Sequence, residues 1–196
     1  MSSAIIGFGA IGQALARAFA RKNIQVSVAT RQSPEAIAPQ AKAIGPTVIA
    51  SSLQDALKAQ IVILAIPFSA IAGLASLASW SGKAVVDTTN AINLTDFTPA
   101  DLGGKFSSSL VQETLSGARV VKAFNTIPAA ILAESPEDDG GRRVVFLSGD
   151  DPAARKDVSA LIDDLGFAPM DLGSLQDGAP QQCFHPLWAK NLILKG

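Results

Sequence analysis

The stretch that decides the fold is Ser3-Ala4-Ile5-Ile6-Gly7-Phe8-Gly9-Ala10-Ile11-Gly12. A short apolar run ends in glycines spaced as G-x-G-x-x-G, and an alanine-rich segment with helical spacing follows at residues 13–20. In a strand–turn–helix unit the first glycine allows a tight turn, the second lets a pyrophosphate approach, and the third lets helix and strand pack closely. Glycines also mark ordinary turns, but residues 24–29 supply the second strand of a βαβ unit. The sequence therefore predicts a bound dinucleotide whose phosphates lie on Gly7, Phe8, Gly9, Ala10, Ile11 and Gly12.

The end of the second predicted strand indicates which dinucleotide binds. It reads Ala29-Thr30-Arg31-Gln32-Ser33-Pro34 and lacks the acidic residue that usually holds the ribose 2′-hydroxyl of NAD. Thr30 and Ser33 offer hydroxyl donors, Arg31 offers a planar cation, and Ser33 followed by Pro34 is typical of a helix N-terminus. Glu35 would repel a phosphate if it pointed inward. An ordinary surface arginine beside a capped helix is the alternative. We predict NADP(H), with Thr30, Arg31 and Ser33 around the 2′-phosphate and NAD as a weaker ligand.

Composition and charge narrow the class of protein. The 196 residues are 48% hydrophobic and 17% charged, which favours one well-buried globular domain. The net charge of -1 gives no electrostatic reason to expect nucleic acid or an anionic membrane as a partner. A single cysteine, Cys183, excludes an internal disulfide and favours a reducing compartment. The chain begins directly with a predicted strand, and its apolar runs are too short to span a bilayer. We expect a cytoplasmic protein without a membrane segment.

Strand-like and helix-like segments alternate along the chain. This alternation predicts an α/β fold, a Rossmann-type doubly wound and mostly parallel sheet with a C-terminal strand–helix extension. We predict one domain over residues 1–196, with a dinucleotide-binding core to about residue 118 and an extension over about 119–196 that lines the site of a second substrate. Further strands are expected at residues 47–49, 61–66, 84–87, 120–124, 144–147 and 168–171. Helices are expected at residues 33–43, 52–58, 68–79, 109–115 and 153–165.

Polar residues follow several of the predicted strands. Ligands of doubly wound sheets lie beyond the carboxyl ends of the strands. One strand end gives Ile66-Pro67-Phe68, another gives Asp87-Thr88-Thr89-Asn90-Ala91, and a third gives Asn125-Thr126-Ile127-Pro128. Asn, Thr and Pro are also ordinary turn residues. Because an amide donates and accepts hydrogen bonds, we expect Asn90 and Asn125 to converge near a nicotinamide carboxamide or a flavin-like ring.

Four segments together resemble a known family. Residues 7–12, 65–68, 121–128 and 170–175 are similar to the NADP-dependent coenzyme F-420 reductases. They are equally similar to the cytosolic NADPH-binding domain of the six-transmembrane metalloreductases. The resemblance spans residues 4–188, and Ala-Phe-Asn-Thr-Ile-Pro at residues 123–128 is more specific than the glycine motif.

The resemblance implies hydride transfer from NADPH to a flavin-like ring laid against the nicotinamide. The acceptor would be coenzyme F-420, FMN or FAD, and a homodimer is implied as well. Such transfer depends on proximity and orientation, so no catalytic acid or base is predicted. The reductases often have His where this chain has Asn125, which leaves the acceptor open. The residues implied to frame the stacked rings are Ile66, Pro67, Asn90, Ala123, Asn125, Thr126, Ile127 and Pro128.

Two further functions compete with this prediction. One is a non-catalytic NADPH-binding module that senses redox state or docks to a partner. The other keeps the enzyme but changes the acceptor, as in imine or hydroxyacid reductases, which need a long helical C-terminal domain. A metal site is not expected, because the only histidine, His185, has only Cys183 as a nearby ligand.

Overall fold

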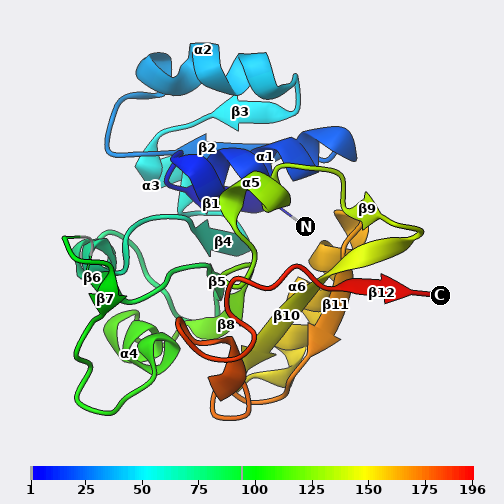
Figure 1. Ribbon diagram of the computed structural model, residues 1–196. Coiled ribbons are helices and arrows are strands. Elements are labelled where there is room, and N and C mark those ends of the chain that lie inside the picture. The colour runs from blue at the N-terminus through cyan, green and yellow to red at the C-terminus, as the bar shows by residue number, and fades with distance from the viewer. Residues whose placement is uncertain (1, 94) are drawn as a thin grey trace.

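The computed structural model describes residues 2–93 and 95–196. Figure 1 shows a long twisted sheet flanked by helices. β2, β3 and α2 lie at the top of the view, and β10 and β11 lie at the lower right. The strands are β1 (Ser3–Ile6), β2 (Val26–Ala29), β3 (Val48–Ala50), β4 (Ile61–Leu64), β5 (Ala84–Asp87), β6 (Ile92–Asn93), β7 (Thr98–Pro99), β8 (Arg119–Ala123), β9 (Glu137–Asp138), β10 (Gly141–Gly149), β11 (Ala168–Asp171) and β12 (Ile193–Lys195). The helices are α1 (Ala10–Arg21), α2 (Pro34–Ile44), α3 (Leu53–Ala56), α4 (Ser107–Thr114), α5 (Ala129–Leu132) and α6 (Pro152–Asp164), with 3₁₀ turns η1 (Phe68–Leu74) and η2 (Ala179–Gln181).

The sheet has the strand order β11-β10-β8-β5-β4-β1-β2-β3. The six strands from β3 to β8 are all parallel, so their carboxyl ends lie along one edge. β10 then runs antiparallel to β8, β11 is parallel to β10, and β9 and β12 extend β10 at its start. This confirms the predicted Rossmann-type, mostly parallel sheet with a C-terminal strand–helix extension. The strand order reverses at β1, next to β4, which is where such sheets bind ligands.

Two hydrophobic layers hold the sheet between its helices. Alternate strand residues point to opposite faces, so Ile5 and Ile63 join one layer while Ile6 and Leu64 join the other. The first layer packs against α1, α2, α5 and α6, and the second packs against α3, η1 and α4. Because the central strands are buried on both faces, they read in the sequence as continuous apolar runs.

Several predicted elements differ from the structure. The helix predicted over residues 68–79 is only the 3₁₀ turn η1, because Gly73 and three serines in that segment are poor helix formers. The helix predicted over residues 52–58 shortens to the single turn of α3. The strand predicted over residues 144–147 extends to the whole of β10, because its amino end pairs with β9 and β12. The hairpin of β6 and β7 and the turn α5 were not predicted.

Within residues 2–93 and 95–196, no helix has the length and apolar character that crossing a bilayer requires.

A candidate dinucleotide and acceptor site

The glycine turn between β1 and α1 is held by close backbone packing. Gly7 has a φ of 103°, and its N–H donates to the carbonyl oxygen of Ala29 over 2.8 Å. A Cβ on Gly7 would overlap the carbonyl of Ala65, and a Cβ on Gly12 would overlap the carbonyl of Gly7. Both overlaps are with backbone atoms, which cannot rotate away. The turn after β1 is therefore wedged between β2, the end of β4 and the first turn of α1.

The N-terminus of α1 is open and has no side-chain cap among the described residues. Gly9 is the N-cap. A Cβ on Gly9 would meet open space, unlike one on Gly7 or Gly12. The first turn is Ala10, Ile11, Gly12 and Gln13, all uncharged, so the helix dipole and its first N–H groups face no competing anion. The Gln13 side chain donates to the carbonyl of Phe8 and steadies the turn. This geometry fits a pyrophosphate.

A cavity of about 330 Å³ opens beside this turn. Its lining includes the polar side chains of Thr30, Arg31 and Ser69 and the apolar side chains of Ile66, Leu74 and Leu77, with Gly7 at the turn. The carboxyl ends of β1, β2 and β4 meet here, as expected at the reversal of strand order. Four of the residues predicted to hold the cofactor, Gly7, Thr30, Arg31 and Ile66, thus share one cavity. Apolar walls with a few polar groups suit an adenosine half.

The two hydroxyl groups predicted to bind the 2′-phosphate, those of Thr30 and Ser33, differ in position: Thr30 lines the cavity and Ser33 does not. Thr30 Oγ1 accepts from the N–H of Gln32 over 3.0 Å, which leaves its own proton free to donate. Ser33 is the N-cap residue of α2, outside the lining of the cavity. A hydrogen bond from the Ser33 hydroxyl lowers the pKa of Glu35, which keeps this exposed carboxylate charged. Ser33 therefore lies close to the negative charge that the sequence identified as unfavourable for a phosphate.

Asn90 and Asn125 meet across the ends of β5 and β8. Asn90 Nδ2 donates to the backbone oxygen of Asn125 over 3.0 Å, and Asn125 Nδ2 donates to Asn90 Oδ1 over 3.1 Å. Asn125 Nδ2 also donates to the backbone oxygen of Gln181 over 2.7 Å. The predicted convergence of the two asparagines is confirmed, and the C-terminal segment closes over them.

Polar atoms beside this pair have free hydrogen-bonding capacity. In the described part of the chain, Asn125 Oδ1 and Thr126 Oγ1 are buried without a partner. Buried polar atoms rarely lack partners, because an unmade hydrogen bond costs about 1–3 kcal/mol. Asn125 Oδ1 is therefore a candidate acceptor for a carboxamide or another ring-edge donor. The side chains of Ala123 and Ile127 belong to the hydrophobic core, whereas Pro67 and Pro128 are exposed at the turns into η1 and α5.

Phe124 lies within the stretch 123–128 that the resemblance places at the site, but the sequence did not indicate its backbone conformation. It is fully buried, yet its φ is 62°, in the left-handed region that costs a bulky residue about 1–3 kcal/mol. Its ring packs edge-on against Phe167, with centroids 6.3 Å apart. This packing holds a backbone turn that directs the next residue, Asn125, toward Asn90. A left-handed phenylalanine has no sequence signature, so only the structure could reveal it.

A fully buried ion pair lies behind the asparagines and was also missed. Lys122 Nζ lies 3.1 Å from Asp87 Oδ2, and both side chains have 0% exposure. Burial alone would raise the pKa of Asp87. The Lys122 charge and hydrogen bonds from Thr89 and Ser108 outweigh it and lower that pKa below its ordinary value. The sequence did contain a signal for this ion pair: Lys122 interrupts an otherwise apolar strand, and a lysine is rarely buried in a central strand unless it is paired.

A second cavity, of about 340 Å³, begins at Ala91, the residue after Asn90. It is lined by residues 99–107 in part and by Gln182, Cys183 and His185 from the C-terminal segment. The Cys183 thiol donates weakly to the carbonyl of Ala91, and burial raises the pKa of this thiol. Among residues 2–93 and 95–196, no three His, Cys, Asp or Glu side chains group so as to hold a metal ion.

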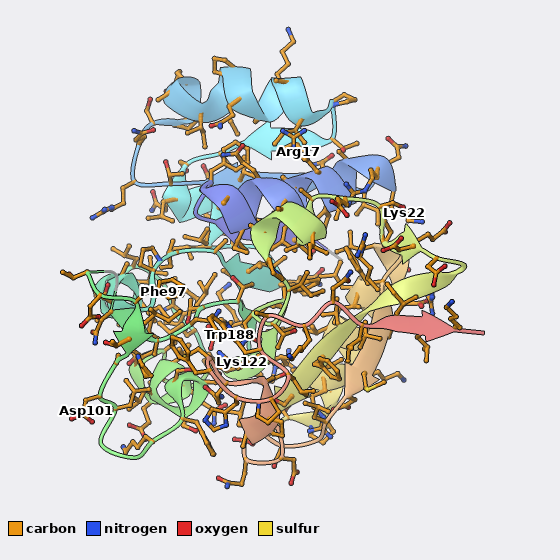
Figure 2. The ribbon with its side chains drawn as sticks, viewed as in Figure 1. Arg17, Lys22, Phe97, Asp101, Lys122 and Trp188 are labelled. Carbon is orange, nitrogen blue, oxygen red and sulfur yellow. The ribbon has the colours of Figure 1, made fainter. Side chains whose placement is uncertain are left out.

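Figure 2 labels Phe97, which lies between β6 and β7, and Trp188, which lies on the C-terminal segment. The two rings cluster with Phe184, whose ring centroid lies 4.6 Å from that of Trp188. Phe97 and Phe184 are exposed. Part of this aromatic cluster is therefore accessible, while the homodimer implied by the resemblance stays a prediction.

Comparison with known proteins connects this geometry to a family. Residues 2–91 match the family model described as NADP oxidoreductase, coenzyme F-420-dependent. The rat metalloreductase STEAP3 is 32% identical over 117 residues, which cover 59% of this chain and 23% of that protein. The chain thus spans less than a quarter of the length of the curated relatives that it matches.

Two solved structures cover nearly the whole chain. The hypothetical protein SMa0349 from Sinorhizobium meliloti superposes with a TM-score of 0.96 and 46% identity, covering 100% of this chain and 96% of that one. A protein from Arthrobacter sp. FB24, assigned as an F-420-dependent NADP-reductase, superposes with a TM-score of 0.75 and 29% identity, covering 91% and 87%. The glycine turn, the cavity beside it and Asn90 thus lie within residues 2–91, the part of the chain that matches the NADP oxidoreductase, coenzyme F-420-dependent family model.

Proposed function

We propose that this chain is an NADPH-dependent oxidoreductase that transfers a hydride between NADP(H) and a flat, flavin-like acceptor. The observation that carries the proposal is that the groups of the candidate site lie along the same edge of the sheet, at the carboxyl ends of its parallel strands. The open N-terminus of α1 adjoins the cavity with Thr30 and Arg31. Two strands further along, Asn90 and Asn125 are paired beside buried acceptor atoms that have no partner in the described chain.

Each group has a distinct role in this proposal. Backbone N–H groups at Ala10 and Ile11 bind the pyrophosphate, and Arg31 with Thr30 binds the 2′-phosphate. Asn125 Oδ1 accepts from the carboxamide and so fixes which face of the nicotinamide is presented. NADPH supplies the hydride when it is bound. The protein contributes proximity, orientation and exclusion of water, and no proton has to be moved by a side chain.

The acceptor is proposed to be coenzyme F-420, FMN or FAD. The family description and the assignment of the Arthrobacter protein support a deazaflavin. The cavity that begins at Ala91 supports an acceptor that enters beside Asn90 and extends toward the C-terminal segment. Its volume of about 340 Å³ is within the range of small-ligand sites.

The test is steady-state oxidation of NADPH with four acceptors: F-420, FMN, FAD and a ferric chelate. Turnover above the acceptor-free rate with at least one flavin-like ring is expected, together with weaker use of NADH. Asn125→Leu should lower kcat because it removes the amide beside the ring. Gln112→Leu is the matched control, since this amide bonds only Asp150, outside the strand-end cluster. Tight NADPH binding with no turnover for any acceptor would favour the redox-sensing or docking module instead. Failure to bind NADPH would refute both functions.

A further inference from the structure

The fully buried Asp87 and Lys122 lie opposite each other on the neighbouring strands β5 and β8. Asp87 is the last residue of β5, Lys122 is the fourth of five residues of β8, and the two are register partners in the parallel ladder. Asn90 follows Asp87 by three residues, and Asn125 follows Lys122 by three. The ion pair therefore sits directly beneath the two loops that carry the paired asparagines.

Hydrogen bonds connect the ion pair to the loop after β5 and to α4. Asp87 Oδ1 accepts from the N–H and the hydroxyl of Thr89, over 2.9 and 2.7 Å. Lys122 Nζ donates to the carbonyl of Thr89 over 3.0 Å and to Ser107 Oγ over 3.3 Å. Ser108 Oγ donates to Asp87 Oδ2 over 2.8 Å. Each charge is thus saturated by groups of the β5 loop or of α4.

The same network continues into the segment that covers Asn125. Ser107 Oγ donates to Gln182 Oε1 over 2.8 Å, while Gln181 Nε2 donates to Ser148 Oγ over 2.6 Å. Gln181 in turn accepts from Asn125 through its backbone oxygen. A displacement of the Lys122 ammonium would therefore change hydrogen bonds in the loop after β5, which carries Asn90, and in the C-terminal segment, which covers Asn125.

Stability alone does not explain such a pair. Taking two ions out of water costs several kcal/mol each, and apolar replacements of the same volume are often neutral or stabilising. A buried pair does fix geometry, because each charge accepts only one arrangement of partners. Because the Asp87–Lys122 pair lies beneath the proposed hydride-transfer site, the geometry that it fixes is that of the two asparagine loops.

We propose that the Asp87–Lys122 pair is a positioning element: it fixes the loops that carry Asn90 and Asn125, and so sets the orientation of the nicotinamide, without touching cofactor or substrate. The inference rests on the proposed function. Its physical basis is the chain of hydrogen bonds from Lys122 to Thr89 on one side and through Ser107 and Gln182 to the C-terminal segment on the other.

Removing the Lys122 charge alone should make the geometry of the two loops depend on pH. In Lys122→Met, burial acts on Asp87 without an opposing charge, so the pKa of this carboxyl rises above its unfolded value. Asp87 is then protonated at low pH and becomes an uncompensated buried anion as the pH increases. The groups around it are Ser108 from α4, Thr89 from its own loop and Lys122 from β8, with the half-buried Cys183 thiol within reach of the Lys122 charge.

The experiment compares four proteins: wild type, Lys122→Met, Asp87→Asn/Lys122→Met and Arg143→Met. Arg143 is the matched control, a buried cation paired with Glu134 and Asp138 at the far end of β10. We measure NADPH affinity by fluorescence titration, kcat with the active acceptor, and the side-chain amide NMR signals of Asn90 and Asn125. Each is followed from about pH 5.5 to about pH 8.5, where the lowered pKa keeps Asp87 charged in the wild type.

Lys122→Met should lose at least about tenfold in kcat at high pH, equivalent to about 1.4 kcal/mol of barrier, with NADPH affinity changed less than about threefold. This loss should shrink but persist as the pH falls and Asp87 becomes neutral, because the hydrogen bonds from Lys122 to Thr89 and Ser107 are still missing. The double variant should lack this pH dependence, and Arg143→Met should keep the wild-type kcat and amide signals. The Asn90 and Asn125 signals should shift in Lys122→Met.

Unchanged kcat and amide signals in folded Lys122→Met would overturn the inference, as would an equal disturbance in Arg143→Met. Should Lys122→Met fail to fold, the double variant decides: wild-type kcat and amide signals in it would overturn the proposal. If the wild type binds no NADPH, the proposed function fails, while the amide signals still report whether the ion pair positions the asparagines.

Discussion

Two glycines of the phosphate turn should respond to substitution in opposite ways. A Cβ on Gly12 overlaps the carbonyl of Gly7, which is backbone, so Gly12→Ala must push α1 away from the turn. Alanine gains about 0.5–1 kcal/mol of helix propensity, whereas overpacking costs about 1–3 kcal/mol. We expect a net loss of about 1–2 kcal/mol. For a chain of this length that lowers Tm by about 2–8 °C.

Gly9→Ser is the informative partner. Gly9 is the uncapped N-cap, and its Cβ position is open, so a serine there can cap the helix and stabilise the free protein by a few tenths of a kcal/mol. The same hydroxyl occupies the space and the N–H group that a pyrophosphate needs. A lost hydrogen bond to a charged group costs about 1.5–3 kcal/mol, so NADPH affinity should fall at least about tenfold.

Thermal unfolding and NADPH titration of the two variants provide the assay. Gly12→Ala should lose both stability and affinity, while Gly9→Ser should lose affinity alone. A Gly12→Ala protein with the wild-type Tm would refute the close approach of α1 to the turn. Wild-type affinity in Gly9→Ser would show that the phosphates do not lie against Gly9.

Three further predictions concern separate parts of the chain. Arg31→Ala should weaken NADPH binding by about 1.5–3 kcal/mol and leave NADH binding nearly unchanged, and an equal loss for both cofactors by titration would place the 2′-phosphate elsewhere. Asp151→Ala should cost about 1 kcal/mol in urea unfolding, because the Asp151 carboxylate caps α6 by accepting from the N–H of Ala154 over 2.7 Å, whereas Asp151→Asn should keep most of the stability. The lowered pKa of Asp87 stabilises the fold above the unfolded value of about 3.9 and loses this contribution as the pH falls through the folded value. The doubly neutral Asp87→Asn/Lys122→Met protein should therefore lose less stability on acidification, and a parallel acid-unfolding curve would contradict the assignment.

Local patterns were enough to predict the nucleotide-binding half of the fold. The strand, the glycine spacing and the helix lie within residues 3–20, and each glycine role depends on neighbours a few positions away. Residues 29–34 predicted a polar end to β2, and Thr30 and Arg31 do line the cavity. The convergence of Asn90 and Asn125 was also predictable, because sequential parallel strands of such sheets lie side by side.

Contacts that depend on register, burial or an unusual backbone angle required the tertiary structure. Ser33 lies next to Glu35, outside the cavity lining, which the residue types alone could not settle. The left-handed turn at Phe124 follows from its packing against Phe167.

The sequence by itself determined the order of strands and helices and the chemistry at the strand ends, because both are written in short-range periodicity. Only the tertiary structure decided that Lys122 and Asp87 form a pair without solvent and that Asn125 retains a free acceptor oxygen. Whether a buried charge or amide finds a partner depends on residues 15–60 positions away, such as Ser107 and Gln181, which only the folded sheet brings within hydrogen-bonding distance.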